Sequence, residues 1–240
     1  MIDTILFDLD GTLLPIAMDD FERVYFNGLG NHFQDIIEPE KLFGMLHRSM
    51  QVMVENTEKI SNEKVFMDAF ATYIAAEDLA MYQARFMDFY LSGFDALKTV
   101  ITPNPWMREA ITLLKTKQYN LIVATNPLFP KLAIDKRIEW AGFDVSEFSY
   151  VTDYEQNHYC KPHLQYYEEI LSDNKLKPEQ CLMVGNDPFE DMIASKLNMT
   201  TFLIEDHVIE RDNPIPAHHQ GSYEDFYEFV KQLPTHQKEQ

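Results

Sequence analysis

The chain has 240 residues, 45% of them apolar, and its 20 basic against 39 acidic side chains give a formal net charge of −19. This composition supports a full hydrophobic core, while the negative charge argues against nucleic acid as a partner, because phosphate backbones are bound by clustered lysines and arginines. No segment approaches the roughly 20 apolar residues of a membrane-spanning helix, and the N-terminus does not resemble a secretion signal, so we expect a cytoplasmic protein without a membrane partner.

The first predicted element is a short apolar strand at 4–7, which leads into the polar sequence Asp8-Leu9-Asp10-Gly11-Thr12. Similar apolar runs follow at 120–125, 148–152, 181–185 and 200–204. Runs that are apolar on both faces are typical of buried parallel strands.

Helical patterns separate these strands from about residue 96 onward. They cover 105–118, 129–141, 163–172, 189–197 and 222–232. Alternation of strand and helix predicts an α/β fold, in which helices cover both faces of a doubly wound parallel sheet.

Residues 16–95 break this alternation and contain no convincing strand. Apolar residues recur there at helical spacing, as in Phe21, Val24, Tyr25 and Leu29. We therefore predict an all-helical domain at 16–95, inserted into a core made of 1–15 and 96–240.

Four polar segments follow the predicted strands. They are Asp8 to Thr12, Thr125-Asn126, Lys161-Pro162, and Gly185 to Asp191. Because ligands bind beyond the carboxyl ends of the strands in open parallel sheets, we expect these segments to meet at one crevice.

The first segment carries the most specific signal. Asp8 and Asp10 are separated by one residue at a strand end, so their side chains point the same way, and Gly11 lets the backbone approach a ligand closely. Two carboxylates with a third from another strand suit Mg²⁺, which prefers oxygen ligands. An Asp-Gly pair alone would indicate no more than a turn.

The other three segments are weak signals when taken singly. Thr125 could be a helix cap, and Lys161 could be a solvated surface lysine. Asp187 and Asp191 could simply favour the positive end of a helix. Their order along the chain and their positions at strand ends make the set specific.

With these residues in place, the chain resembles the haloacid dehalogenase superfamily of hydrolases, whose four motifs the four segments match in order. The resemblance implies a Rossmann-like core with a helical cap after the first motif. It implies that Asp8 is the nucleophile and that Asp10 is the general acid and base. It also implies that Mg²⁺ is held by Asp8, by the backbone carbonyl of Asp10 and by an acid of the fourth segment. Lys161, Thr125 and Asn126 would then bind the phosphoryl group.

The fourth segment departs from the family's usual Gly-Asp, because it contains Gly185-Asn186-Asp187. Alignment on the spacing between the two acids makes Asp187 the metal ligand and Asp191 its support. Alignment on the glycine makes Asn186 the ligand instead. We favour Asp187, because a carboxylate holds Mg²⁺ better than an amide.

The resemblance favours a Mg²⁺-dependent phosphatase that hydrolyses a small phosphorylated metabolite through an aspartyl-phosphate. Asp10 favours phosphatase over dehalogenase activity, because a carbon centre needs no proton donor at that position. The alternatives are a phosphomutase, a phosphonatase, which would need a cap lysine, and a non-catalytic phosphate-binding regulatory protein. The sequence does not indicate the oligomeric state.

Overall fold

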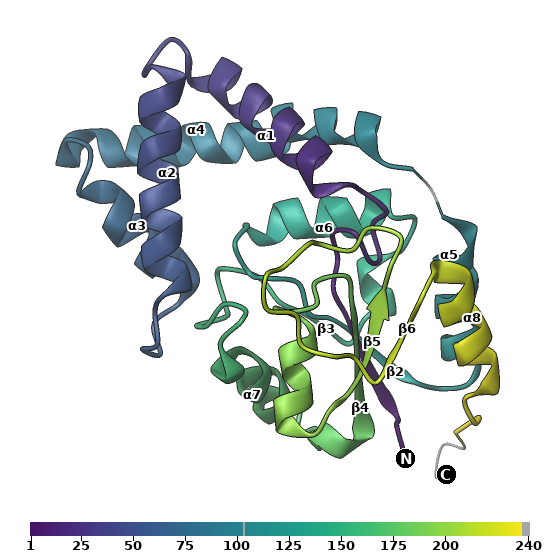
Figure 1. Cartoon of the computed structure of the whole chain (residues 1–240). Coiled ribbons are helices and arrows are strands. Elements are labelled where there is room, and N and C mark those ends of the chain that lie inside the picture. Colours follow the sequence, from purple (N-terminus) through teal and green to yellow (C-terminus); the bar gives the residue numbers. More distant parts are fainter. Residues whose placement is uncertain (103, 237–240) are drawn as a thin grey trace.

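The computed structural model describes residues 1–102 and 104–236, and its centre is a parallel sheet of six strands in the order β3-β2-β1-β4-β5-β6 (Figure 1). The strands are β1 Thr4–Phe7, β2 Asn120–Val123, β3 Tyr150–Val151, β4 Cys181–Gly185, β5 Thr200–Ile204 and β6 His219–Gly221. β1 lies at the centre, where Leu6 faces Ile122 of β2 and Met183 of β4. The predicted α/β class with a doubly wound parallel sheet is confirmed.

Helices cover both faces of this sheet. They are α5 Pro105–Thr116, α6 Lys131–Trp140, α7 Leu164–Asp173 and α8 Tyr223–Gln232. Successive side chains of a strand point to opposite faces, so Ile5 and Phe7 pack in the cluster that contains α5, α6 and α8, while Leu6 packs with α7. The strands are therefore apolar throughout because neither face meets water.

The prediction differs from the structure at two elements. β6 was not predicted, because it has three residues and two of them, His219 and Gln220, are polar and exposed. The α-helix predicted at 189–197 was wrong, since the structure has a 3₁₀ helix, η5, at Met192–Leu197. Apolar spacing over so short a segment does not distinguish the two helix types.

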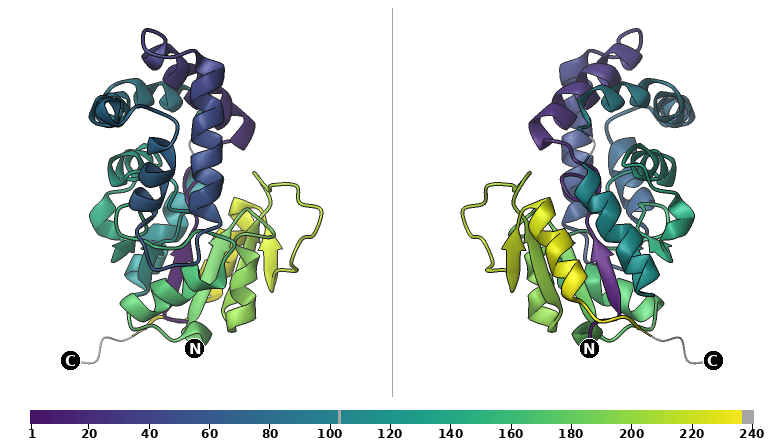
Figure 2. Two further views of the ribbon diagram at one scale, coloured as in Figure 1. Left: turned by 90° about the vertical axis from the view of Figure 1, so that its left-hand side faces the viewer. Right: turned by 90° about the vertical axis from the view of Figure 1, so that its right-hand side faces the viewer.

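Residues 16–95, all of which the structure describes, are helical and contain no strand, as predicted. Their four α-helices lie beyond the carboxyl ends of the strands (Figures 1 and 2). The helices are α1 Met18–Phe33, α2 Pro39–Val54, α3 Asn62–Ala71 and α4 Leu79–Leu91, followed by a 3₁₀ run, η2, at Gly93–Val100. Aromatic rings such as Phe33, Phe70 and Phe86 form much of their shared interior. The division into a catalytic core and a cap domain stays a prediction, and its core range includes Pro103 and 237–240, which lie outside the described residues.

The helical region is closely joined to the sheet region. Phe21 and Tyr25 of α1 pack against Phe129, which follows β2, with ring centroids 5.8 and 5.5 Å apart. The backbone N–H of Asn62, at the start of α3, donates to the carbonyl of Asn157 at 2.9 Å. Within the described ranges, no helix is both long and apolar enough to cross a membrane.

Candidate active site

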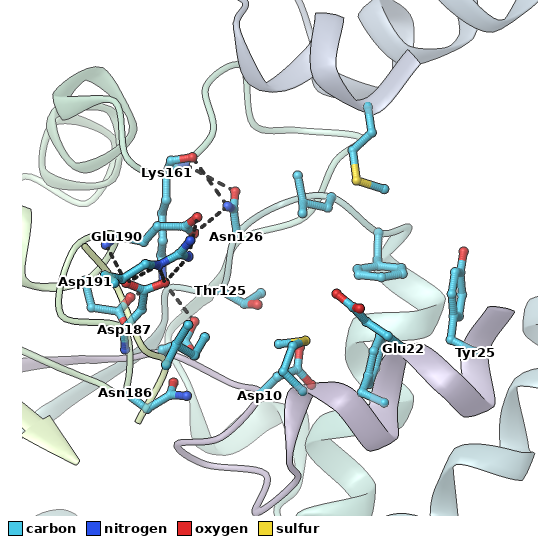
Figure 3. Close-up of a pocket in the computed structure, with 18 of the residues that line it drawn as sticks. Asp10, Glu22, Tyr25, Thr125, Asn126, Lys161, Asn186, Asp187, Glu190 and Asp191 are labelled. Atoms are coloured by element: carbon cyan, nitrogen blue, oxygen red, sulfur yellow. Dashed lines mark hydrogen bonds and ion pairs between the residues drawn. The ribbon is translucent and has the colours of Figure 1, made fainter. Parts of the chain in front are cut away.

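The four polar segments meet in one pocket of about 390 Å³, as the strand topology requires. Asp8, Asp10, Thr125, Asn126 and Lys161 line it, together with four residues of the fourth segment, Asn186, Asp187, Glu190 and Asp191. In Figure 3 the labelled side chains of the second, third and fourth segments occupy one side of the pocket, Glu22 and Tyr25 of α1 lie on the other, and Asp10 lies between them.

Lys161 is the central cation of the site. Its side chain is 1% exposed, and its Nζ donates to Asp8 Oδ1 at 2.8 Å and to Asp191 Oδ1 at 2.6 Å. Burial alone would lower the pKa of Lys161, but the charges of Asp191 and Asp8 outweigh it and hold the pKa well above its usual value. Lys161 is thus a permanent positive charge beside the predicted nucleophile.

A hydrogen bond within the fourth segment fixes Asp191 beside this lysine. Its second oxygen, Oδ2, accepts a hydrogen bond from the backbone N–H of Asp187 at 3.0 Å. Gly185 makes the arrangement possible, because a Cβ at that position would lie 2.1 Å from Asp191 Oδ2. The glycine that ends β4 is therefore required by close packing against Asp191.

Both carboxylate oxygens of Asp187 have hydrogen-bond partners. Its Oδ1 accepts hydrogen bonds from the backbone N–H groups of Phe189 at 2.8 Å and Glu190 at 3.0 Å. Arg211, from the loop between β5 and β6, pairs with both carboxylate oxygens, with 3.0 Å between Nε and Oδ2. Sequence reasoning missed Arg211, since nothing in the loop pattern marks it as a partner of Asp187.

Asn186, the alternative metal ligand, lies against the first segment. Its Oδ1 accepts a hydrogen bond from the Thr12 hydroxyl at 3.1 Å, and its Nδ2 donates to the carbonyl of His207 at 2.7 Å. Gly11 has φ +82°, and a Cβ there would lie 2.2 Å from Asn186 Nδ2. Glycine is therefore required at position 11 for two reasons: the positive φ, and the lack of room for a Cβ beside Asn186.

Asp10 forms an ion pair with Arg137 of α6, a second residue that sequence reasoning missed. Arg137 is fully buried, and its guanidinium carbon lies 4.6 Å from the ring centroid of Phe129 and 5.7 Å from that of Phe21. Burial raises the pKa of Asp10 to about 6, although Arg137 works in the opposite direction. A carboxyl with this pKa can both give and take a proton near neutral pH.

Thr125 and Asn126 follow β2 at the pocket wall. The Asn126 amide makes two hydrogen bonds. Its Oδ1 accepts from the backbone N–H of Lys161 at 3.2 Å, and its Nδ2 donates to Glu190 Oε2 at 2.9 Å. The carbonyl of Thr125 accepts the hydroxyls of Thr152 and Tyr166. These bonds fix the loop, and the contact of both side chains with a phosphoryl group stays a prediction.

The donor chemistry of the pocket suits a hard divalent cation. Six carboxylates line it against two basic side chains, and the buried Oδ1 of Asp10 has no hydrogen-bond partner among the described residues. No group of three or more His, Cys, Asp or Glu side chains in the described part of the chain is close enough to form a ready metal cage. Asp187 would have to release Arg211 before it could act as a ligand.

A comparison with protein-family models decides the family. The model of the haloacid dehalogenase-like hydrolases matches residues 2–197, which includes all four polar segments. The chain belongs to this family of hydrolases. A search of the curated proteins found no match.

Solved structures with the same fold cover nearly the whole chain. A predicted phosphoglycolate phosphatase from Haemophilus somnus has a TM-score of 0.60 at 17% identity, over 95% of this chain and 98% of that one. CbbY from Rhodobacter sphaeroides, in complex with xylulose-(1,5)bisphosphate, has a TM-score of 0.60 at 15% identity, over 94% and 96%. A 2-haloacid dehalogenase from Pseudomonas syringae pv. tomato has a TM-score of 0.66 at 16% identity, over 97% and 99%. At these identities the likeness establishes the fold of this haloacid dehalogenase-like hydrolase and leaves its substrate open.

Proposed function

We propose that this hydrolase is a Mg²⁺-dependent phosphatase that cleaves a small phosphorylated metabolite through an aspartyl-phosphate. The observation that carries the proposal is the placement of Asp8 and Asp10 in one pocket, the first paired with Lys161 and the second a carboxyl with a pKa of about 6. The phosphatase structures among its structural neighbours support this choice.

In the first half of the reaction, an oxygen of Asp8 attacks phosphorus and the bond from phosphorus to the leaving oxygen breaks. Asp10, in its protonated form, gives its proton to that leaving oxygen. In the second half, Asp10 takes a proton from water, which attacks the phosphorus of the aspartyl-phosphate and regenerates Asp8. Lys161 stabilises the negative charge on the phosphoryl oxygens, and Thr125 and Asn126 orient them.

Asp8, the backbone carbonyl of Asp10 and Asp187 would hold the metal, with Asn186 as the alternative to Asp187. Asp191 would act through its contacts with Lys161 and with the backbone of Asp187. When bound, Mg²⁺ would neutralise the phosphoryl oxygens as charge develops on them.

The other candidate activities have less support. Asp10 disfavours a dehalogenase, although dehalogenases are among the structural neighbours. A phosphonatase needs a cap lysine, and Lys41, Lys59 and Lys64 do not line the pocket. A phosphomutase would use the same residues but pass the phosphoryl group to a second substrate rather than to water. A non-catalytic binding protein would not need Asp10 as an acid.

The test is hydrolysis of phenyl phosphate, followed as release of inorganic phosphate, with Mg²⁺ and with EDTA. We expect turnover only with the metal, and a loss of at least about 10³-fold in Asp8→Asn, because an amide is a poor nucleophile. Asp19→Asn, an exposed aspartate at the start of α1, is the matched control and should keep full activity. Unchanged activity in Asp8→Asn would overturn the mechanism.

A further inference from the structure

The side of the pocket that faces the phosphoryl site is apolar apart from Glu22. Phe21, Tyr25, Phe26 and Met50, from α1 and α2, line it together with Phe129. Tyr25 contributes its ring, and its hydroxyl is hydrogen-bonded to the Tyr90 hydroxyl at 2.9 Å. The leaving group of a substrate held at Asp8 would lie against this wall, which is on the side of the pocket where Figure 3 labels Tyr25.

Within the part of the chain that the structure describes, this pocket offers no free cation to a second anionic group. Among the described residues that line it, the basic side chains are Lys161 and Arg211. Lys161 is paired with Asp8 and Asp191, and Arg211 is paired with Asp187 and Glu190. If Asp187 released Arg211 to hold a metal, the ion pair of Arg211 with Glu190 at 3.2 Å would remain.

The charges near the apolar wall also disfavour a second anionic group. Glu22 is the charged side chain that α1 and α2 contribute to the pocket lining, and it is negative. Arg137 is fully buried, is paired with Asp10, contacts the rings of Phe21 and Phe129 and does not line the pocket, so a leaving group does not reach its guanidinium. A carboxylate or second phosphate on the leaving group would lose its water and gain only repulsion.

We infer that the substrate is a monophosphate ester with a neutral, largely apolar leaving group, and that the pocket discriminates against a second anionic group. This inference rests on the proposed phosphatase function and specifies its substrate class. Two effects produce this specificity. The favoured ester gains apolar contact with the wall, and the disfavoured ester buries a negative charge without a counter-charge.

The test compares phenyl phosphate with 4-carboxyphenyl phosphate, two esters of similar shape that differ in one negative charge. We expect kcat/KM for phenyl phosphate to be higher by at least about tenfold. Equal or better hydrolysis of the carboxylated ester would overturn the inference and leave the phosphatase function intact.

Failure to hydrolyse either ester would instead count against the phosphatase function. Binding of phenylphosphonate and 4-carboxyphenylphosphonate to the wild-type protein, measured by calorimetry, then decides the inference on its own. We expect tighter binding of phenylphosphonate, again by about tenfold. Equal affinities, or tighter binding of the carboxylated compound, would overturn it.

A pair of variants tests the wall directly. Met50→Lys places a cation in the pocket lining, while Met87→Lys adds the same charge on α4, where Met87 is 45% exposed and does not line the pocket. We expect the ratio of kcat/KM for the carboxylated over the plain ester to rise about tenfold in Met50→Lys and to stay unchanged in Met87→Lys. Equal ratios in the two variants would overturn the assignment of this wall to the leaving group.

Discussion

Asp10 and Arg137 form a buried ion pair that links the first polar segment to a helix. Arg137 has no exposed surface, and its Nη2 has no hydrogen-bond partner among the described residues. Removal of one partner from a buried pair leaves an uncompensated charge, which costs more than the pair itself contributes. Arg137 therefore holds Asp10 in place at the bottom of the pocket.

Near pH 8, where Asp10 is ionised in the wild type, Arg137→Met should lower the free energy of unfolding by about 1–3 kcal/mol, measured by urea denaturation, because Asp10 must then either stay charged without its partner or take up a proton against the solution pH. Adding Asp10→Asn to this variant should recover part of the loss, since the amide needs no counter-charge. Arg108→Met is the control, because Arg108 is 50% exposed and its pair with Glu147 contributes at most about 1 kcal/mol. Strictly additive losses in the double variant would contradict the pairing.

Two glycines with positive φ allow the steric effect of Asn186 on position 11 to be separated from the effect of backbone conformation. Gly11 has φ +82° and Asn186 Nδ2 beside it, while Gly142 has φ +87° and open space within 4 Å of the point where a Cβ would lie. Gly142→Ala should cost about 1–2 kcal/mol for the backbone conformation alone. Gly11→Ala should cost about 1–3 kcal/mol more through overpacking. Equal losses in urea denaturation would show that Asn186 moves aside freely.

At the scale of elements, the strand ends were the predictable part of the structure. Apolar runs predicted five of the six strands, and their parallel pairing places the loops that carry Asp8, Lys161 and Asp191 at the same edge of the sheet. The loop conformations that bring Lys161 into contact with Asp8 and Asp191 were not predictable from the strand pattern. The short polar strand β6 carried no such signal. Arg137 and Arg211 were not predictable either, since they lie 127 and 24 positions from their partners Asp10 and Asp187, with no motif to join them.

The segment after β4 leaves two candidate metal ligands, and Mg²⁺ binding measured by calorimetry separates them. If Asp187 is the ligand, Asp187→Asn should weaken binding by about tenfold or more, because a charged oxygen is lost. Asn186→Ala should then have the smaller effect. The reverse order would assign the metal to Asn186 and leave Asp187 as the partner of Arg211.

At the scale of the whole molecule, the helical region and the sheet region share one apolar interior. A single cluster of buried side chains contains Phe21 and Phe33 from α1 together with Ile5 and Phe7 from β1. Domains that are joined by a continuous core tend to unfold together, because neither keeps its interior without the other.

We therefore expect a single unfolding transition in urea. Trp140 packs on Phe94 with ring centroids 5.3 Å apart, at the junction of the two regions, and Trp106 packs on Tyr227 at 5.5 Å within the core. Tryptophan fluorescence and far-ultraviolet circular dichroism should give the same midpoint. Two separated midpoints would show that the helical region unfolds on its own.

The burial of Lys161 has a consequence for the chemistry of the chain's amines. Acylating reagents attack the neutral amine, and this one is protonated, enclosed and held between two carboxylates. Surface lysines therefore react first, and acylation of Lys161 marks the molecules in which the centre of the site has opened to solvent.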